Sequence, residues 1–412
     1  MRRRQAFALA AGVLLAAVCP IVSDPKQAAA DGRTRITLPP LSGRYPVGTI
    51  DLHLVDTRND PWRAGEPREL MVTVAYPAQP GGTRAAWVSE PVAAVLDRSA
   101  PESLDIPADT VDWAYTRRHA VEAAAVDDSG PWPLVLFSPG LGSPRELNTV
   151  RVDDLASYGY VVVSISHTGD AEVVEFPDGR LVTGIPDRNQ TYVETALDTR
   201  ITDTQFVLDA MNRLRDGENP DAGNRSLPTG LAEASDLDKV GMFGHSLGGY
   251  TAGEVMCVDP RVRAGVNLDG GMALGRLRSI TEHGVDRPFM LIGSDPIIDP
   301  ASGRTYEHSH ATPQLDWSWT QFWLNQRAWK RDLHFHNSSH YSFTDLQAVI
   351  PQLAELISPK ACHQMVGSID PTESLQAQSA YLTAFFDLHL NQVPTTLFDT
   401  NSPDYPDVRF VS

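Results

Sequence analysis

A serine stands among closely spaced glycines in the segment KVGMFGHSLGGYTAG, residues 239–253. Its central part, GHSLG at 244–248, fits the pattern G-x-S-x-G, which also arises by chance in ordinary chains. Here an apolar run precedes the serine and a helix-like run follows it. A sharp turn between strand and helix requires very small residues two positions before and after the serine. The segment therefore predicts that Ser246 is a nucleophile at a tight turn.

A serine hydroxyl is a poor nucleophile without a base, and histidine is the expected base. The sequence contains 12 histidines. His340 lies in NSSHYSFTD, directly after the last strand-like run, where residues distant in the chain meet at the rim of a sheet. His245 adjoins the serine, but on a tight turn its side chain points elsewhere. We therefore expect His340 to be the base.

Two pairs of alternating histidines could also suggest a metal ion. They are His308 with His310, and His334 with His336. Zinc in proteins is held by at least three protein ligands, and no third ligand lies near either pair in the sequence. We expect no metal site.

Two aspartates end consecutive strand-like runs and are candidates for the acid that orients the imidazole. Asp269 closes VRAGVNLDG, and Asp295 closes RPFMLIGSD. Both give the chain order serine, aspartate, histidine, so spacing does not choose between them.

A second glycine-rich segment, FSPGLGSPR at 137–145, follows an earlier strand-like run. Acyl transfer needs two backbone N–H groups aimed at the charge that develops on the substrate oxygen. One comes from Leu247, the residue after the nucleophile, and the other from this earlier loop. Gly140 and Gly142 let the loop backbone approach a tetrahedral intermediate closely.

These residues need a scaffold that brings their loops together. From residue 133 onward, short apolar runs end in small or polar residues and alternate with helix-like stretches such as 202–216 and 246–258. This order predicts an α/β fold with a mainly parallel central sheet flanked by helices. Ligands of such sheets lie beyond the carboxyl ends of the strands, which is where the candidate residues stand.

Other parts of the chain surround this core. The alternating runs 48–58 and 69–77 predict N-terminal antiparallel strands. The insertions 85–125 and 168–200 are candidates for a wall or lid over the rim, or else ordinary surface elements.

The amino-acid composition indicates the class of protein, and the net charge indicates which partners are unlikely. The 412 residues are 42% hydrophobic and 21% charged, as in globular proteins, and residues 31–412 can form a single domain. The net charge of -18 makes nucleic acid and anionic membranes unlikely partners.

Residues 1–30 combine three arginines, an apolar run and small residues before Asp31. This pattern predicts a signal peptide and a secreted protein. The apolar run is too short to be a transmembrane span. Cys257 and Cys362 remain after cleavage, and an oxidising compartment favours a disulfide between them.

Together the motifs resemble the platelet-activating factor acetylhydrolase family, the plasma and intracellular type II group of α/β-hydrolases with its bacterial relatives. The segments that carry the resemblance are YPVGTIDLHLVDTRNDPW, RELMVTVAYPA, LVLFSPGLGSPR, GHSLGGYTAG, VNLDGGM and HNSSHYSFTDL. They are spread over most of the chain. The resemblance implies an α/β-hydrolase fold and ester hydrolysis, with no metal or organic cofactor.

The resemblance also assigns roles. In this family the acid follows the strand directly after the nucleophile helix, which favours Asp269 and leaves Asp295 as the alternative. Leu141 becomes the second oxyanion amide beside Leu247. We expect activity to fall below about pH 6, where the histidine base is protonated.

The substrates implied are short acyl esters, including sn-2 esters of phospholipids. A general esterase or lipase, an acyltransferase with the same residues, and a binding protein on an inactive hydrolase scaffold remain open. The aromatic segment DWSWTQFW, 316–323, either lines an acyl pocket or packs in the core, and partial helical spacing favours the core.

Overall fold

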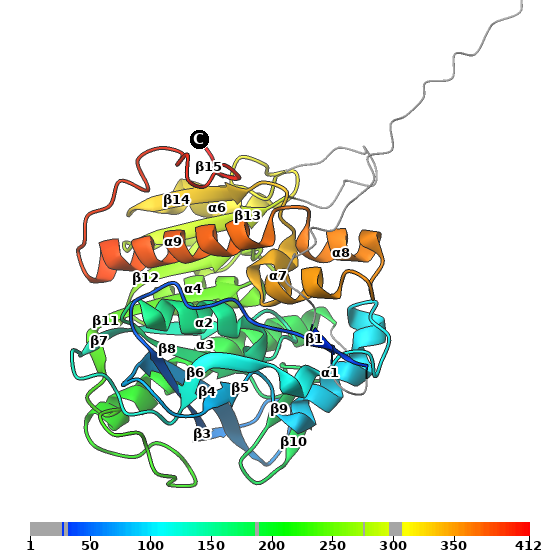
Figure 1. The fold of residues 1–412 in the computed structure, drawn as a ribbon. Helices are drawn as coiled ribbons and strands as arrows, with labels where there is room; N and C mark the ends of the chain where they lie inside the picture. Colours follow the sequence, from blue (N-terminus) through cyan, green and yellow to red (C-terminus); the bar gives the residue numbers. More distant parts are fainter. Residues whose placement is uncertain (1–26, 29–31, 186–188, 275–276, 296–306) are drawn as a thin grey trace, which may run out of the picture.

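The computed structural model describes residues 27–28, 32–185, 189–274, 277–295 and 307–412. Most of the predicted signal peptide, 1–30, therefore lies outside the described residues. A large sheet runs through the molecule with helices on both sides (Figure 1).

The strands of the sheet are β3 (Val47–Asn59), β4 (Pro67–Pro77), β5 (Arg84–Ala86), β6 (Arg117–Glu122), β7 (Trp132–Ser138), β8 (Val161–Ser166), β11 (Ser235–His245), β12 (Val262–Leu268), β13 (Phe289–Ser294), β14 (Lys330–Phe335) and β15 (Val408–Phe410). Two short antiparallel pairs lie apart from it, β1 (Gln27–Ala28) with β2 (Thr34–Arg35) and β9 (Val173–Glu175) with β10 (Leu181–Thr183). The helices are α1 (Glu90–Ser103), α2 (Thr149–Ser157), α3 (Gln190–Arg215), α4 (Leu247–Val258), α5 (Ser279–His283), α6 (Trp317–Asn325), α7 (Leu346–Val349), α8 (Pro359–Val366) and α9 (Pro371–Leu390).

In the described residues the sheet has 11 strands in the order β15-β14-β13-β12-β11-β7-β8-β4-β3-β6-β5. All neighbours from β14 through β8 are parallel. At one side β4 runs antiparallel to β8, and β3 antiparallel to β4, so the predicted N-terminal strands are confirmed. The predicted fold class is confirmed as well.

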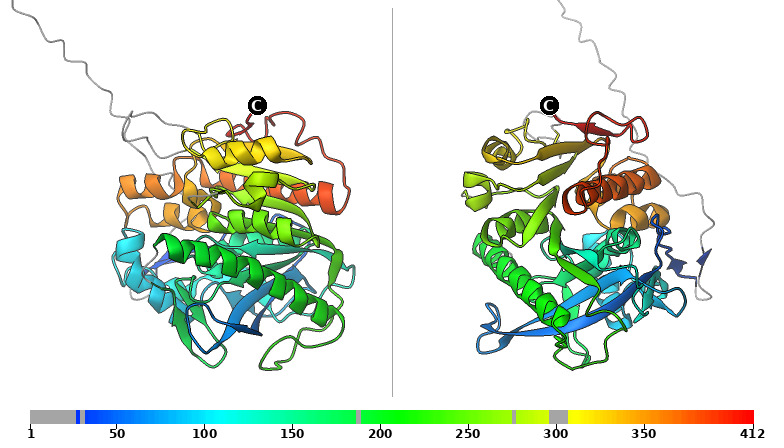
Figure 2. Two further views of the ribbon diagram at one scale, coloured as in Figure 1. Left: turned by 180° about the vertical axis from the view of Figure 1, so that it is seen from behind. Right: turned by 90° about the vertical axis from the view of Figure 1, so that its left-hand side faces the viewer.

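Side chains that alternate along the central strands build a core on each face of the sheet. On β11, Met242 packs with α3, α4 and α6, while the next residue, Phe243, packs with α2 and α9 on the other face. Figure 2 shows these two helical layers from behind and from the side. Both side chains are fully buried, and each such burial stabilises the fold by roughly 1.5–3 kcal/mol.

Helix α3 is longer than the predicted stretch 202–216 and begins at Gln190. The side chain of Asn189 accepts a hydrogen bond from the Tyr192 N–H, which caps the helix, and Leu197 is already buried. The end of the predicted insertion 168–200 is thus part of a packed helix. The other insertion, 85–125, contributes α1, which packs with α7 and α8 in a third core cluster.

The predicted disulfide between Cys257 and Cys362 is wrong, because Cys257 is a free thiol. Cys257 packs against the core cluster around α4, whereas Cys362 is buried in the separate cluster of α1, α7 and α8. Burial raises the pKa of the Cys257 thiol to about 12, so the thiol stays protonated and unreactive. Of the helices that the structure describes, none has the length and apolar composition needed to cross a bilayer.

Candidate active site

Ser246 occupies the sharp turn between β11 and α4. Its backbone angles, φ 54° and ψ -123°, belong to a region that residues with a side chain rarely adopt. A Cβ on Gly244 would lie 2.2 Å from the Gly248 backbone, and a Cβ on Gly248 would lie 1.8 Å from the Ser138 carbonyl oxygen. Both glycines are therefore required. The Ser246 N–H donates to the Leu268 carbonyl at 2.8 Å, which fixes the turn against β12.

His340 begins a short 3-10 helix, His340–Phe343, after β14. Its Nδ1 lies 2.6 Å from Oδ2 of Asp269. Among the described residues no hydrogen bond joins the Ser246 hydroxyl to the His340 ring; such contacts often tighten only when substrate is bound.

His245 links the turn at Ser246 to the loop that carries His340. Its Nε2–H donates to the His340 carbonyl at 2.9 Å, and the two rings lie 4.5 Å apart between centroids. Burial, with the neighbouring His340 ring, holds the pKa of His245 well below its usual value, so this imidazole is neutral. Because His245 immediately precedes Ser246, this hydrogen bond joins the loop that carries His340 to the turn that carries Ser246.

Asp269 is buried at the end of β12 and its carboxylate takes part in four hydrogen bonds with three residues. Oδ1 accepts hydrogen bonds from the Ser294 N–H at 2.9 Å and from His308 Nδ1 at 2.7 Å. Oδ2 accepts from the Ser294 hydroxyl at 2.8 Å and from His340. Burial alone would raise the pKa of Asp269, but His308 and His340 outweigh burial and hold the pKa well below the usual range. The carboxylate is therefore ionised.

His308 is a site residue that the sequence interpretation missed. Besides Asp269, it contacts Asp316 through Nε2 at 3.1 Å, and its ring stacks on the buried Trp319 with centroids 4.0 Å apart. Burial would lower the pKa of His308, but the two carboxylates raise it to about 10. His308 is therefore a cation at neutral pH. Its spacing to His310 gave no indication of an aspartate partner, because that contact forms only in the tertiary structure.

Asp295, the alternative acid, lies at the end of β13 and faces other histidines. It contacts His334 Nε2 at 2.8 Å and His336 Nδ1 at 3.3 Å. The structure thus brings Asp269, and not Asp295, into contact with His340. The aromatic segment supplies core packing in part, since Trp319 is fully buried while Trp317 is half exposed.

The loop after β7 passes beside the serine. A Cβ on Gly140 would lie 3.4 Å from the Ser246 Cβ. Neither the Leu141 nor the Leu247 N–H donates any of the turn, loop or cap hydrogen bonds of the described chain. Both amides are therefore candidates for the two donors that the sequence predicts.

A buried arginine on α3 holds the start of this loop. The Arg200 guanidinium donates to Ser138 Oγ at 3.2 Å, to the Gly140 carbonyl at 3.0 Å and to the Pro139 carbonyl. It also pairs with Asp170, whose other oxygen accepts from the Gly142 N–H at 2.8 Å. One ion pair therefore fixes the loop on both sides of Leu141. The sequence interpretation missed these anchors because they lie on distant segments.

A second set of serine, histidine and aspartate residues forms a hydrogen-bond network at the end of β7. His167 contacts Ser138 Oγ through Nε2 and Asp203 through Nδ1, each at 3.0 Å. Asp203 in turn accepts two hydrogen bonds from Arg68. Ser138, His167 and Asp203 are all at most 1% exposed, so no substrate reaches them and their role is structural.

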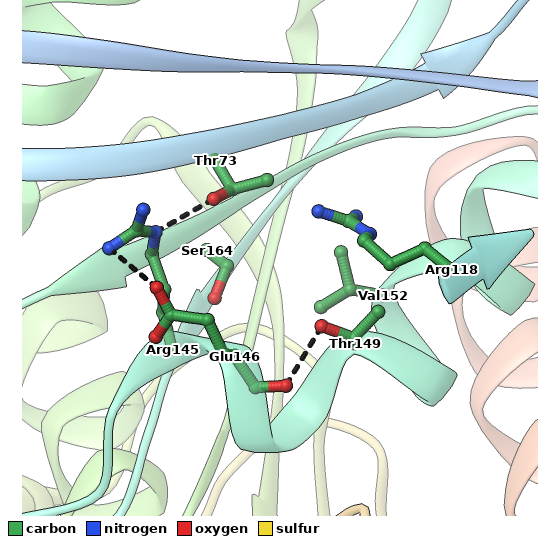
Figure 3. Close-up of a pocket in the computed structure, with 7 residues that line it drawn as sticks. All are labelled: Thr73, Arg118, Arg145, Glu146, Thr149, Val152 and Ser164. Atoms are coloured by element: carbon green, nitrogen blue, oxygen red, sulfur yellow. Dashed lines mark hydrogen bonds and ion pairs between the residues drawn. The ribbon is translucent and has the colours of Figure 1, made fainter. Parts of the chain in front are cut away.

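Arg145 holds the far end of the loop. Its Nε donates to Thr73 Oγ1 at 2.7 Å, and its guanidinium pairs with Glu146 at 3.0 Å, as Figure 3 shows, and with Asp51 at 2.9 Å. Thr73, Arg145 and Glu146 border a polar cavity of about 10 Å³. A cavity of that size has room for about one water molecule and none for an ester substrate.

The model of one protein family, described as platelet-activating factor acetylhydrolase, isoform II, matches residues 31–400. The chain belongs to this family.

Individual relatives agree with the family assignment. A protein of Arthroderma benhamiae named probable 1-alkyl-2-acetylglycerophosphocholine esterase is 28% identical over 289 residues, which cover 68% of this chain and 66% of the fungal one. The platelet-activating factor acetylhydrolase of Canis lupus familiaris is 27% identical over 157 residues, which cover 34% of this chain and 35% of the canine one. The matches therefore span less than two thirds of the length of these curated relatives.

A solved structure is similar over nearly its whole length. The ferulic acid esterase from Streptomyces cinnamoneus superimposes with a TM-score of 0.73 at 31% identity, and the match covers 92% of this chain and 99% of the esterase. The acetylhydrolase family and the esterase structure together support a carboxylic ester hydrolase built on the α/β-hydrolase fold.

Proposed function

We propose that this protein is a secreted serine ester hydrolase, in which Ser246 is the nucleophile, His340 the general base and Asp269 the acid that orients it. The observation that carries the proposal is the contact of 2.6 Å between His340 Nδ1 and the buried Asp269 carboxylate, beside the strained turn of Ser246. The N-terminal pattern of residues 1–30 supports export.

In the first half of the reaction His340 Nε2 takes the proton of the Ser246 hydroxyl while Oγ attacks the ester carbonyl carbon. The N–H groups of Leu141 and Leu247 donate to the oxygen that becomes negative. The tetrahedral intermediate then collapses, the bond to the leaving alcohol breaks, and His340 gives that alcohol its proton. An acyl-serine remains.

In the second half a water molecule takes the place of the alcohol. His340 removes a proton from the water, whose oxygen attacks the acyl carbonyl, and the carboxylic acid leaves as Ser246 regains its proton. Asp269 accepts the Nδ1–H of His340 throughout. It thereby keeps Nε2 free to accept a proton and stabilises the imidazolium that forms.

Two substrate classes have specific support. The fungal relative's name and the family indicate short acyl groups, including those on glycerophosphocholine. The Streptomyces neighbour is a ferulic acid esterase, which favours a hydroxycinnamoyl ester as the second candidate. The net charge of -18 offers little attraction for an anionic phosphate, which weighs toward neutral esters.

The test is a substrate panel on the wild type, Ser246→Ala and, as a matched control, the exposed Ser103→Ala. The panel comprises p-nitrophenyl esters from acetate to palmitate, methyl ferulate, and phosphatidylcholines with short or long sn-2 chains. Ser246→Ala should lose at least about 1000-fold in kcat. A fluorophosphonate should label wild type once per chain and spare the variant. Equal activity of Ser246→Ala and wild type would refute the proposal, and added acceptor alcohols would reveal acyl transfer.

A further inference from the structure

Three side chains outside the catalytic residues gather where β13 and β14 end. Asp295 follows β13, and His334 and His336 come from the last part of β14 and the residue after it. One ligand atom from each lies within 4.8 Å of the others. The two strands lie side by side near one edge of the sheet (Figure 1). The histidine pair was set aside in the sequence for want of a third ligand, and the neighbouring strand supplies one.

The strand register explains why the three meet. Ser294 of β13 pairs with Phe335 of β14, so Asp295 emerges beside the residue that follows Phe335. His334 and His336 are two residues apart, and side chains with that spacing point to the same face of a strand. The carboxylate thus faces both imidazoles.

Two contacts already join the three side chains. His334 Nε2 lies 2.8 Å from one oxygen of Asp295, and His336 Nδ1 lies 3.3 Å from the other. Tetrahedral zinc with bonds of about 2.0–2.2 Å separates its ligand atoms by about 3.3 Å. The contact to His334 therefore needs to open by only about 0.5 Å for an ion to enter.

The donor set selects the class of ion. Two imidazole nitrogens and one carboxylate oxygen suit zinc and its transition-metal neighbours, whereas magnesium and calcium prefer oxygen ligands. The His334 ring is buried and gives a rigid base, while 53% of the His336 side chain and 24% of the Asp295 side chain are exposed, which leaves an entry path. The nearby Arg409, opposite His334 in the ladder, is paired with Glu307.

We propose that Asp295, His334 and His336 form a zinc site with water as the fourth ligand. On binding, the ion takes the lone pairs of two neutral imidazole nitrogens and a carboxylate oxygen, and any proton on those atoms leaves to solvent. This inference does not depend on the proposed esterase function.

The proposed zinc site adjoins the segments that carry Asp269 and His340. Ser294, the residue before Asp295, holds both oxygens of Asp269, and the Asn337 N–H donates to Asp295 at the start of the loop that leads to His340. An ion bound to Asp295 ties these two segments together, so its expected effect is on stability.

The test uses the full chain without a polyhistidine tag, stripped with a chelator. Calorimetric titration with zinc chloride should give one ion per chain, and thermal unfolding should shift to higher temperature with zinc but not with magnesium or calcium. His336→Ala, at a half-exposed position, should weaken zinc binding by more than about 10-fold, since even outer-shell changes cost that much. The exposed His283→Ala should bind as wild type does.

Two results would overturn the proposal. One is the absence of zinc uptake by a folded wild type. The other is uptake that His336→Ala and the isosteric Asp295→Asn leave unchanged while His340→Ala abolishes it, which would place the ion at the catalytic histidine instead.

Discussion

His308 Nδ1 lies 2.7 Å from Oδ1 of Asp269, and His340 Nδ1 lies 2.6 Å from the other oxygen of the same carboxylate. One buried carboxylate therefore binds two histidine rings that have different surroundings. His308, held between Asp269 and Asp316, is a cation at neutral pH, whereas 39% of the His340 side chain is exposed to solvent. His308 is thus a positioning residue for the proposed acid.

Replacing His308 by glutamine should lower kcat by about 10- to 100-fold, because small displacements of a catalytic group cost rate on that scale. Loss of the cation near Asp269 also makes the site more negative. A protonated His340 is then favoured, so the acid limb of the kcat/KM profile should move to higher pH. A matched control is His310→Gln, since His310 Nδ1 contacts Asp332 instead. An unmoved acid limb would reduce His308 to a packing role.

The raised pKa of His308 also predicts how the stability of the fold depends on pH. Its pKa is raised from 6.5 to about 10, so between these values the folded state holds a proton that the unfolded state has lost. The stabilisation is complete below about pH 6.5 and disappears as pH rises through about 10. Urea unfolding at several pH values should show this decline in wild type and a flatter curve in His308→Gln. Parallel curves for the two proteins would contradict it.

The two candidate acids make opposite predictions. Asp269→Asn should lower kcat by about 10⁴-fold, because an amide in that place favours the wrong imidazole tautomer. Asp295→Asn, whose partners are His334 and His336, should cost much less. Steady-state rates with p-nitrophenyl acetate decide between them, and a larger loss in Asp295→Asn would reverse the assignment.

The ion pair between Asp170 and Arg200, which anchors the glycine loop, leads to a prediction about both stability and kcat. Asp170→Asn leaves the buried Arg200 charge without its carboxylate, which should destabilise the fold by about 3–5 kcal/mol. A displaced Leu141 N–H would weaken the proposed hydrogen bond to the oxyanion, which forms mainly in the transition state. Kcat should therefore fall by about 100-fold with little change in KM. The exposed Asp178→Asn is the matched control. A raised KM at constant kcat would show that the loop acts on substrate binding instead.

The sequence predicted the parallel sheet and the turn at Ser246, because both depend on local patterns of apolar residues and glycines. Spacing along the chain could not separate Asp269 from Asp295, and only the resemblance to the acetylhydrolase family favoured Asp269. The two aspartates end adjacent parallel strands, and only the path of the chain after β14 decides which one His340 meets. The contacts of His308 and Arg200 were also out of reach, since their partners lie 39 and 30 residues away, with no spacing rule to connect them.

The predicted disulfide failed for a related reason. Cysteine spacing carries no information about which core cluster each thiol enters, and Cys257 and Cys362 enter different ones. The predicted helix began at residue 202, whereas α3 begins at Gln190. The first turns of α3 contain many polar residues, although its buried face begins at Tyr192.

The hydrogen bond from His245 to the His340 carbonyl means that the residue before Ser246 connects the turn to the loop that carries His340. A displacement of the segment that carries His340 is therefore transmitted to the residue next to Ser246, so the proposed base and the proposed nucleophile move together.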